Sequence, residues 1–290
     1  MTDATEPPPE GTPAPAPPAG RRMVGGRNLP LAIGVGLALA GMFIGSLLWH
    51  PIAFAAVVAG LTIMAYVEAG RALRHLGIHL EVAVAIVATL VMLFGAYQAG
   101  HAGQAVGVAV LILGGLLSQL SDSRRSDVVR TLSVTTMFGL WVGFLASFAV
   151  LLVNRPSGPL IVFAVVAAAI FTDIGGYAFG VTLGRHRIAP SVSPSKTWEG
   201  FLGGVLASVV VLALLLPRFG EVFTPATAAA LAAACGIVSF LGDLVESMLK
   251  RDLGVKDFGD VLPGHGGILD RVDGILLALP VGYYVVELLV

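Results

Sequence analysis

Nine long apolar stretches dominate this chain, and each is long enough, at about 18 to 25 residues, to cross roughly 30 Å of hydrocarbon as a helix. Charged residues make up only 12% of the 290 residues and hydrophobic residues 56%, whereas soluble domains contain roughly 25% charged residues. The pattern predicts an all-α, polytopic integral membrane helical bundle of about nine transmembrane helices, and it excludes a soluble globular domain. The stretches lie near residues 29–48, 51–68, 80–98, 103–120, 131–153, 159–183, 199–217, 224–249 and 267–289.

The Lys and Arg residues are unevenly divided between the two sides of such a bundle. If the N-terminus is inside, 15 of the 17 basic residues lie on the inner side, and only Arg155 and Arg218 lie outside. Cytoplasmic segments carry the excess of Lys and Arg in membrane proteins. We therefore expect a multi-pass protein of the cell inner (plasma) membrane, with a cytoplasmic N-terminus and a C-terminus outside.

The chain divides into three parts by composition. Residues 1–28 include seven prolines between Pro7 and Pro18, and this composition predicts a disordered cytoplasmic tail because it cannot form a packed core. Residues 29–158 are expected to form the N-terminal transmembrane helices. Residues 159–290 are expected to form a C-terminal transmembrane region that contains the catalytic residues, because the acidic residues inside apolar stretches gather there.

Carboxylates inside these apolar stretches point to function, since a charged Asp at the middle of a membrane costs about 2.5–3.5 kcal/mol on insertion scales. Asp173 lies in the sixth stretch. Asp243 and Glu246 are three residues apart in the eighth, and Asp270 and Asp273 repeat that spacing at the start of the ninth. Residues three apart share one face of a helix, so two helix ends are expected to direct several carboxylates into one inward-facing pocket.

Such a pocket predicts a site for a hard cation. Oxygen ligands with little His or Cys favour Mg²⁺ over zinc or copper, which makes Asp243, Asp270 and Asp273 candidate metal ligands. The alternative is a set of satisfied salt bridges inside the membrane, in which Asp270 or Asp273 pairs with Arg271 or Lys250.

A second polar segment, SVSPSKTWEG at residues 191–200, precedes the seventh stretch. Hydroxyl groups, an ammonium group and backbone N–H groups next to a helix start are suited to phosphate oxygens. The candidates are Ser193, Ser195, Lys196 and Thr197. A purely local alternative is that Ser195 caps the following helix and Glu199 completes a capping box.

One motif joins most of these features. Residues 247–273 read SMLKRDLGVKDFGDVLPGHGGILDRVD and match S-x-x-K-R-x4-K-D-x-G-x2-L-P-x-H-G-G-x-x-D-R-x-D. The chain thereby resembles the phosphatidate cytidylyltransferases, membrane enzymes that make CDP-diacylglycerol from CTP and phosphatidic acid. The segment S-P-S-K-T-x-E-G and the pair Asp173 and Tyr177, which fit D-x-x-x-Y, resemble the same family, whereas residues 1–158 resemble it only as apolar spans.

The resemblance implies transfer of CMP from CTP to phosphatidic acid with release of pyrophosphate, in phospholipid biosynthesis. It implies a cytosol-facing site with a paired-metal arrangement in which Mg²⁺ is one ion, as well as dimeric packing in the bilayer, and it implies no nucleic-acid partner. Asp243, Asp270 and Asp273 would hold metal and, with Lys196, form the catalytic group. The substrate-binding residues would be Asp173, Ser193, Ser195, Lys196, Thr197, Lys250, Arg251, Lys256, Asp257, His265 and Arg271.

Three other functions share some of these features. A CTP-dependent polyprenol or lipid kinase would share nucleotide, topology and magnesium, but the complete K-R to D-R-x-D run argues against it. A CDP-alcohol phosphotransferase should show D-G-x-x-A-R followed by paired aspartates, which the sequence lacks. An ion-coupled transporter could also bury acidic residues, but the acids cluster in the C-terminal half without the repeat symmetry typical of transporters.

Overall fold

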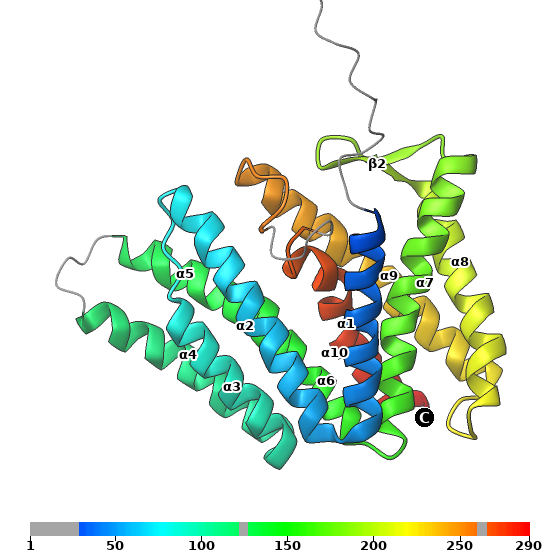
Figure 1. Ribbon diagram of the computed structural model, residues 1–290, viewed down its shortest axis with the longest axis horizontal. Coiled ribbons are helices and arrows are strands. Elements are labelled where there is room, and N and C mark those ends of the chain that lie inside the picture. Colours follow the sequence, from blue (N-terminus) through cyan, green and yellow to red (C-terminus); the bar gives the residue numbers. More distant parts are fainter. Residues whose placement is uncertain (1–28, 122–126, 260–265) are drawn as a thin grey trace, which may run out of the picture.

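The computed structural model describes residues 29–121, 127–259 and 266–290. The protein is a bundle of long helices, as the apolar stretches predict (Figure 1). The predicted Pro-rich tail and His265 lie outside the described residues. Within the described part of the chain, eight helices are long and apolar enough to cross a membrane, and Gly34–Trp49 adds a shorter apolar helix.

Within the described residues, the helices form nine segments that run back and forth between the two ends of the bundle (Figure 1). The first four are α1 (Leu29–Trp49), α2 (Pro51–His75), α3 (Val82–Ala99) and α4 (His101–Ser121). The fifth is continuous through α5 (Val128–Phe138), the π-helical turn η1 (Gly139–Phe144) and α6 (Leu145–Val153). The last four are α7 (Gly158–Leu183), α8 (Trp198–Leu215) with the 3₁₀ turn η2 (Leu216–Arg218), α9 (Pro225–Asp252) and α10 (Leu269–Leu289).

The C-terminal helices pack very closely because glycines face each other between them. Gly200 and Gly204 of α8 lie against Gly176 and Thr172 of α7, and a Cβ at Gly200 would lie 2.8 Å from the Gly176 carbonyl oxygen. Small residues of this kind let helix backbones approach in a membrane. The main apolar core is formed by α6, α7, α9 and α10 and by parts of α2 and α3.

A small antiparallel hairpin, β1 (Arg187–Ala189) and β2 (Ser193–Thr197), interrupts the helices between α7 and α8. The sequence predicts only helices and a polar connection here. Contacts to the start of α8 hold the hairpin, because the Trp198 N–H donates to the His186 carbonyl at 2.9 Å and the Glu199 carboxylate accepts from the backbone N–H groups of Arg185 and His186.

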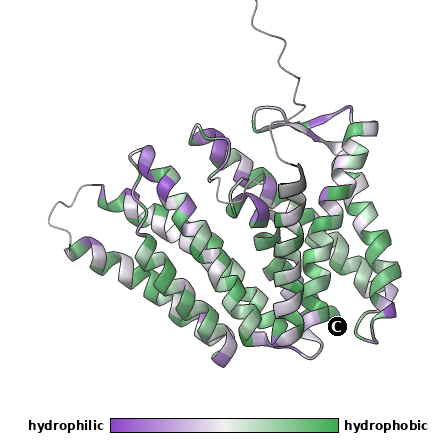
Figure 2. Ribbon diagram, viewed as in Figure 1, coloured by the Kyte–Doolittle hydropathy of each residue, from purple (hydrophilic) through white to green (hydrophobic). Residues whose placement is uncertain are grey.

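Polar residues gather at the two ends of the bundle and apolar residues between them (Figure 2). The hairpin, the end of α2, the start of α5 and the end of α9 lie at one end, and the C-terminus lies at the other (Figure 1). Ten of the twelve described Lys and Arg residues belong to the hairpin end: Arg71, Arg74, Arg130, Arg185, Arg187, Lys196, Lys250, Arg251, Lys256 and Arg271. Arg155 and Arg218 are the two at the opposite end.

Candidate active site

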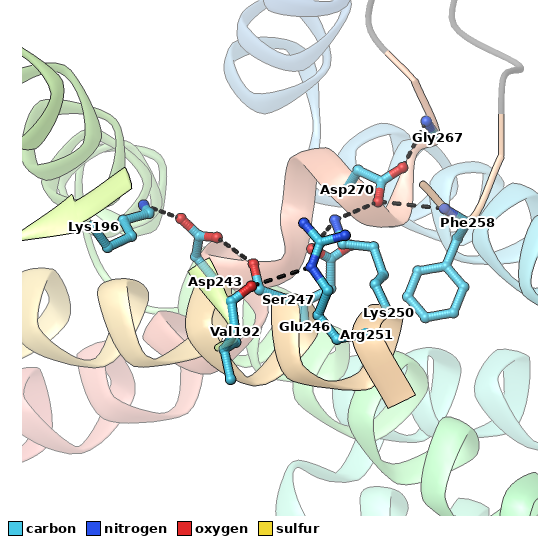
Figure 3. A network of polar contacts seen from close by, with 10 residues as sticks. All are labelled: Val192, Lys196, Asp243, Glu246, Ser247, Lys250, Arg251, Phe258, Gly267 and Asp270. Atoms are coloured by element: carbon cyan, nitrogen blue, oxygen red, sulfur yellow. Dashed lines mark hydrogen bonds and ion pairs between the residues drawn. The ribbon is translucent and has the colours of Figure 1, made fainter. Parts of the chain in front are cut away.

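Lys196 of β2 reaches across to the carboxylate of Asp243 on α9 and forms an ion pair with it (Figure 3). Ser247, one turn later on α9, donates its hydroxyl to the other oxygen of Asp243 at 3.4 Å. The Lys196 ammonium also lies 5.2 Å from the centre of the Phe240 ring, a distance suited to a cation–π interaction. Two predicted site residues, Lys196 and Asp243, therefore contact each other directly.

Asp273 joins this group because α9 and α10 touch backbone to backbone. A Cβ at Gly242 would lie 2.9 Å from both the Asp273 carbonyl oxygen and the Gly274 Cα. This contact sets the residues next to the two glycines, Asp243 and Asp273, beside each other. Asp273 interacts electrostatically with Asp243 and with Asp173 of α7, and Asp173 interacts with Lys196, so carboxylates from three helices lie near one another.

Asp270 belongs to a neighbouring group organised by Lys250. The Lys250 ammonium lies 2.6 Å from Glu246 and 2.9 Å from Asp270. The second oxygen of Asp270 accepts the Gly267 N–H at 2.9 Å, in a turn where Gly266 has a φ of +82° that favours glycine. In Figure 3, Lys250 stands between the two carboxylates. This is the salt bridge that the alternative interpretation of the acidic residues expected.

Glu68 of α2 was not among the predicted residues, yet it is buried beside the start of α10. Its side chain is 2% exposed, and Oε2 accepts the Ile268 N–H at 2.7 Å. A Cβ at Gly259 or at Gly267 would lie within 2.8 Å of its carboxylate group. Glu68, on a helix from the N-terminal half, thus contacts the connection between α9 and α10 in two places, at Gly259 and at Gly267 and Ile268.

Two pockets with charged residues in their lining open beside these groups. The first has a volume of about 270 Å³ and lies between α7, β2, α8 and α9; Asp173, Tyr177, Ser195, Lys196 and Thr197 are among its lining residues. The second has a volume of about 370 Å³ and lies between the end of α2 and residues 255–259, lined in part by Glu68, Arg71, His75 and Asp257. Arg71 and His75, which were not predicted as site residues, therefore belong to the surroundings of the motif.

The local alternative for the hairpin segment concerned the residues that cap α8. Thr197, not Ser195, caps α8 by accepting the Gly200 N–H at 3.1 Å. Glu199 does not complete a capping box, because it binds the hairpin backbone and the His186 ring instead, so the local alternative was wrong in its residues.

Of four further predicted residues, three belong to the motif and one to the hairpin. Arg251 donates from Nε to the carbonyl of Val192 in the hairpin turn at 3.2 Å (Figure 3). Lys256 is exposed on the connection after α9, and Arg271 is exposed at the start of α10. Ser193, the last hydroxyl residue of the predicted set, begins β2.

The carboxylates are suited to a hard cation because they offer oxygen donors, although they are not closely grouped. Among the described residues, no three Asp, Glu, His or Cys side chains lie close enough together to hold a metal ion. Asp173, Asp243 and Asp273 nevertheless present only oxygen donors, as Mg²⁺ prefers. Like charges that face one another in a medium of low dielectric constant are stabilised by a cation, and these three helix positions are therefore chemically suited to one.

Comparison with known proteins gives a consistent result over the whole bundle. The cytidylyltransferase family matches residues 31–289. A phosphatidate cytidylyltransferase of Mycobacterium leprae is 36% identical over 279 residues, which cover 91% of this chain and 89% of the relative. A phosphatidate cytidylyltransferase of Synechocystis is 34% identical over 293 residues, with 91% and 96% covered. One of Thermotoga maritima is 36% identical over 185 residues, with 62% and 68% covered.

Proposed function

Because the chain belongs to the cytidylyltransferase family, we propose that it is a CTP:phosphatidate cytidylyltransferase. It transfers CMP from CTP to phosphatidic acid and yields CDP-diacylglycerol and pyrophosphate. The observation that carries this function is the match to phosphatidate cytidylyltransferases over 91% of the chain. The carboxylates and lysines at one end of a membrane bundle support it, since one substrate is a lipid and the other a polyanion.

The reaction asks the protein for positioning and charge compensation. A phosphate oxygen of phosphatidic acid forms a bond to the α-phosphorus of CTP, and the bond from that phosphorus to the oxygen bridging to the β-phosphorus breaks, so pyrophosphate leaves. No covalent enzyme intermediate is needed, and preorganised charge at the reacting phosphates lowers the barrier. We assign this role to the partly buried Lys196 and Lys250, with Arg251, Lys256 and Arg271 around them.

Several of the site residues serve to hold the others. Lys250 fixes Asp270 from one side and the Gly267 N–H fixes it from the other. Glu68 holds the Ile268 N–H of the same turn. We propose that residues 159–290 form the catalytic region, with α2 as a support from the N-terminal region. Ser193, Ser195, Thr197 and Asp257 complete the proposed substrate contacts, together with His265, which lies outside the described residues.

The family resemblance implies a divalent cation, and we propose Mg²⁺ as one ion of a two-cation site. Asp243 and Asp273 would hold it, with Asp173 beside them and Asp270 as the remaining predicted ligand. A bound divalent cation supplies positive charge to the triphosphate. That supply is needed because a phosphomonoester contributes about −1.5 to −2 charges near neutral pH and the carboxylates around Lys196 are negative as well.

We propose that the hairpin end of the bundle faces the cytoplasm of the cell inner membrane. Ten of the twelve described basic residues lie at that end, and the positive residues of membrane proteins favour the cytoplasmic side. A single cysteine at Ser193, in a Cys235→Ser background, is expected to react with a membrane-impermeant maleimide only in inverted vesicles. Reaction in intact cells would show that the hairpin end faces outward and would refute this orientation. We also propose a homodimer, as the family resemblance implies.

The activity is tested with purified protein in lipid nanodiscs. CTP and phosphatidic acid are added, and CDP-diacylglycerol is measured by mass spectrometry together with pyrophosphate. We expect equal amounts of the two products, and Asp243→Asn is expected to be nearly inactive although folded. Asp127→Asn is the matched control, because Asp127 is an exposed aspartate at the start of α5, with a φ of 56° that Asn also accepts. Absence of CDP-diacylglycerol with folded protein would refute the proposal.

A further inference from the structure

A large apolar cavity lies beside α7 and α10. Its volume is about 450 Å³, and α1, α2, α6, α7 and α10 with the η1 turn enclose it. In Figure 1, α1 stands in front of α10, with α2 and α7 on either side. Thr62 and Arg271 are the two polar residues among the described lining residues, and the Thr62 hydroxyl is satisfied within its own helix by the Ala59 carbonyl.

The cavity exists because α1 packs mainly against α2 and makes few contacts with α7 and α10. Met42 and Ile44 of α1 and Ile170 of α7 are at its rim and are exposed, so it opens sideways to the hydrocarbon of the bilayer. Lipid tails are as apolar as leucine, so no hydrophobic force closes such a gap in a membrane. An apolar cavity of this kind is instead filled by hydrocarbon, which restores the dispersion contacts of its lining.

The charged end of the cavity lies at the same end of the bundle as the active site. Val272, Ile275 and Leu279 of α10 and Ile268, the residue just before it, line the cavity along one face, as their spacing of three and four residues requires. Arg271 lies at the same end as Asp270, its neighbour in the chain, within the first turn of α10. A ligand that fills this cavity and meets Arg271 would therefore combine an acyl chain with an anionic group at the end of the bundle where the carboxylates lie.

We propose that this cavity binds one acyl chain of phosphatidic acid, which enters from the bilayer between α1 and α7 and places its phosphate at Arg271. This inference rests on the proposed function and adds to it the path and the orientation of the lipid substrate. Because the chain exchanges one apolar surrounding for another, the cavity contributes little affinity. Its effect is to align the phosphate, so a blocked cavity should slow turnover of long-chain substrate.

Filling the cavity from α1 tests this alignment. Ala40 lines the cavity and is itself exposed, whereas Ala38, two residues away on the same helix, does not line it and is also exposed. Ala40→Trp is expected to lower kcat/KM for dioleoyl phosphatidic acid by about tenfold or more, as misplacement of a reacting group does. It should leave kcat/KM for dibutyryl phosphatidic acid and the KM for CTP unchanged. Ala38→Trp should change none of these values.

Two results would overturn the proposal: wild-type kinetics of Ala40→Trp on the long-chain lipid, or an equal loss on both lipids. Photo-crosslinking gives a readout that does not depend on turnover. Phosphatidic acid with a diazirine in the middle of one acyl chain, in phosphatidylcholine nanodiscs, is expected to label Met42, Phe171 and Ile275.

Unlabelled phosphatidic acid should suppress this labelling, and added phosphatidylcholine should not. Arg271→Gln should weaken the labelling. Labelling spread over the outer faces of the bundle, or insensitivity to phosphatidic acid, would refute the acyl site. Correct, competed labelling in a protein that makes no CDP-diacylglycerol would support the lipid site and count against the proposed reaction instead.

Discussion

The contact between α9 and α10 can be tested by adding one methyl group to it. In Gly242→Ala, the new Cβ would lie 2.9 Å from the Asp273 carbonyl oxygen and from the Gly274 Cα, whereas ordinary contacts of this kind begin at 3.4 Å. Both neighbours are backbone atoms, so no side chain can move aside. The two helices must separate at this level by about half an ångström, and Asp243 and Asp273 move apart with them.

The expected effect is larger on catalysis than on stability. Overpacking typically costs about 1–3 kcal/mol, and the replacement of a helical glycine by alanine returns roughly 0.5–1 kcal/mol. The net loss in the free energy of unfolding should therefore be small. A misplacement of about 1 Å can cost 10²-fold in rate, so a shift of half that size predicts a drop of about tenfold in kcat.

The assay is the initial rate of CDP-diacylglycerol formation at saturating CTP, with thermal unfolding in detergent as the measure of folding. Gly60→Ala is the control, since Gly60 lies in the interior of α2 and a Cβ there would meet nothing within 4 Å. It should keep the wild-type rate. If Gly242→Ala also keeps the wild-type rate, the close approach of the two helices does not set the geometry of the carboxylates.

Three further outcomes follow from the contacts of the site. Lys196→Ala is expected to lower kcat/KM by about 10²-fold or more while its unfolding temperature stays near that of the wild type, because the lysine is at the bundle end and acts on phosphates; a variant with most of its turnover would make Lys196 only a topology charge. Glu68→Ala leaves the Ile268 N–H without its acceptor and should cost about 1–3 kcal/mol of stability, whereas Glu68→Gln keeps an acceptor oxygen and should restore most of it; unchanged stability of the alanine variant would contradict the role given to Glu68. Chelation of divalent cations should abolish activity and added Mg²⁺ should restore it, and chelator-resistant turnover would exclude the metal site.

The helices and the main site could be predicted because their signals are local. An apolar run of sufficient length specifies a membrane helix by itself, and the predicted stretches and observed helices agree to within a few residues for most of the bundle. The largest difference is α2, which continues to His75 instead of ending near residue 68. Glu68, the first charged residue of α2, is surrounded by protein rather than by lipid. Its charge therefore does not mark the end of the helix.

Glu68 could not be placed from the sequence because its partner Ile268 is 200 residues away. A signal was nevertheless present. The rule that a carboxylate within an apolar stretch marks a function applies to Glu68 as it does to Asp173, but Glu68 was taken as the boundary of its stretch.

The grouping of the aspartates also differs from the spacing argument. Asp270 and Asp273, three residues apart, were expected to share one pocket with Asp243. In the structure, Lys250 and the Gly267 N–H hold Asp270, while the glycine contact sets Asp273 beside Asp243. The dipeptides Gly242-Asp243 and Asp273-Gly274 carried this information, because glycines at facing positions permit the closest helix approach.

The hairpin between α7 and α8 had no strand signal. Its residues are mostly Ser, Pro, Arg and Lys, and they lack the β-branched and aromatic alternation that predicts strands. It forms because tertiary contacts, chiefly those of Glu199 and Trp198 with the backbone at residues 185–186, hold its ends together.

The central claim is that the chain transfers the CMP group of CTP to a lipid phosphate, and the fate of the two ends of CTP tests it most directly. Purified protein is given phosphatidic acid and CTP that is radiolabelled either at the α-phosphorus or at the γ-phosphorus. We expect the α-label to enter the lipid fraction and the γ-label to leave as pyrophosphate, with both processes lost in Asp243→Asn. Transfer of the γ-label to the lipid would identify a CTP-dependent lipid kinase and refute the cytidylyltransferase function.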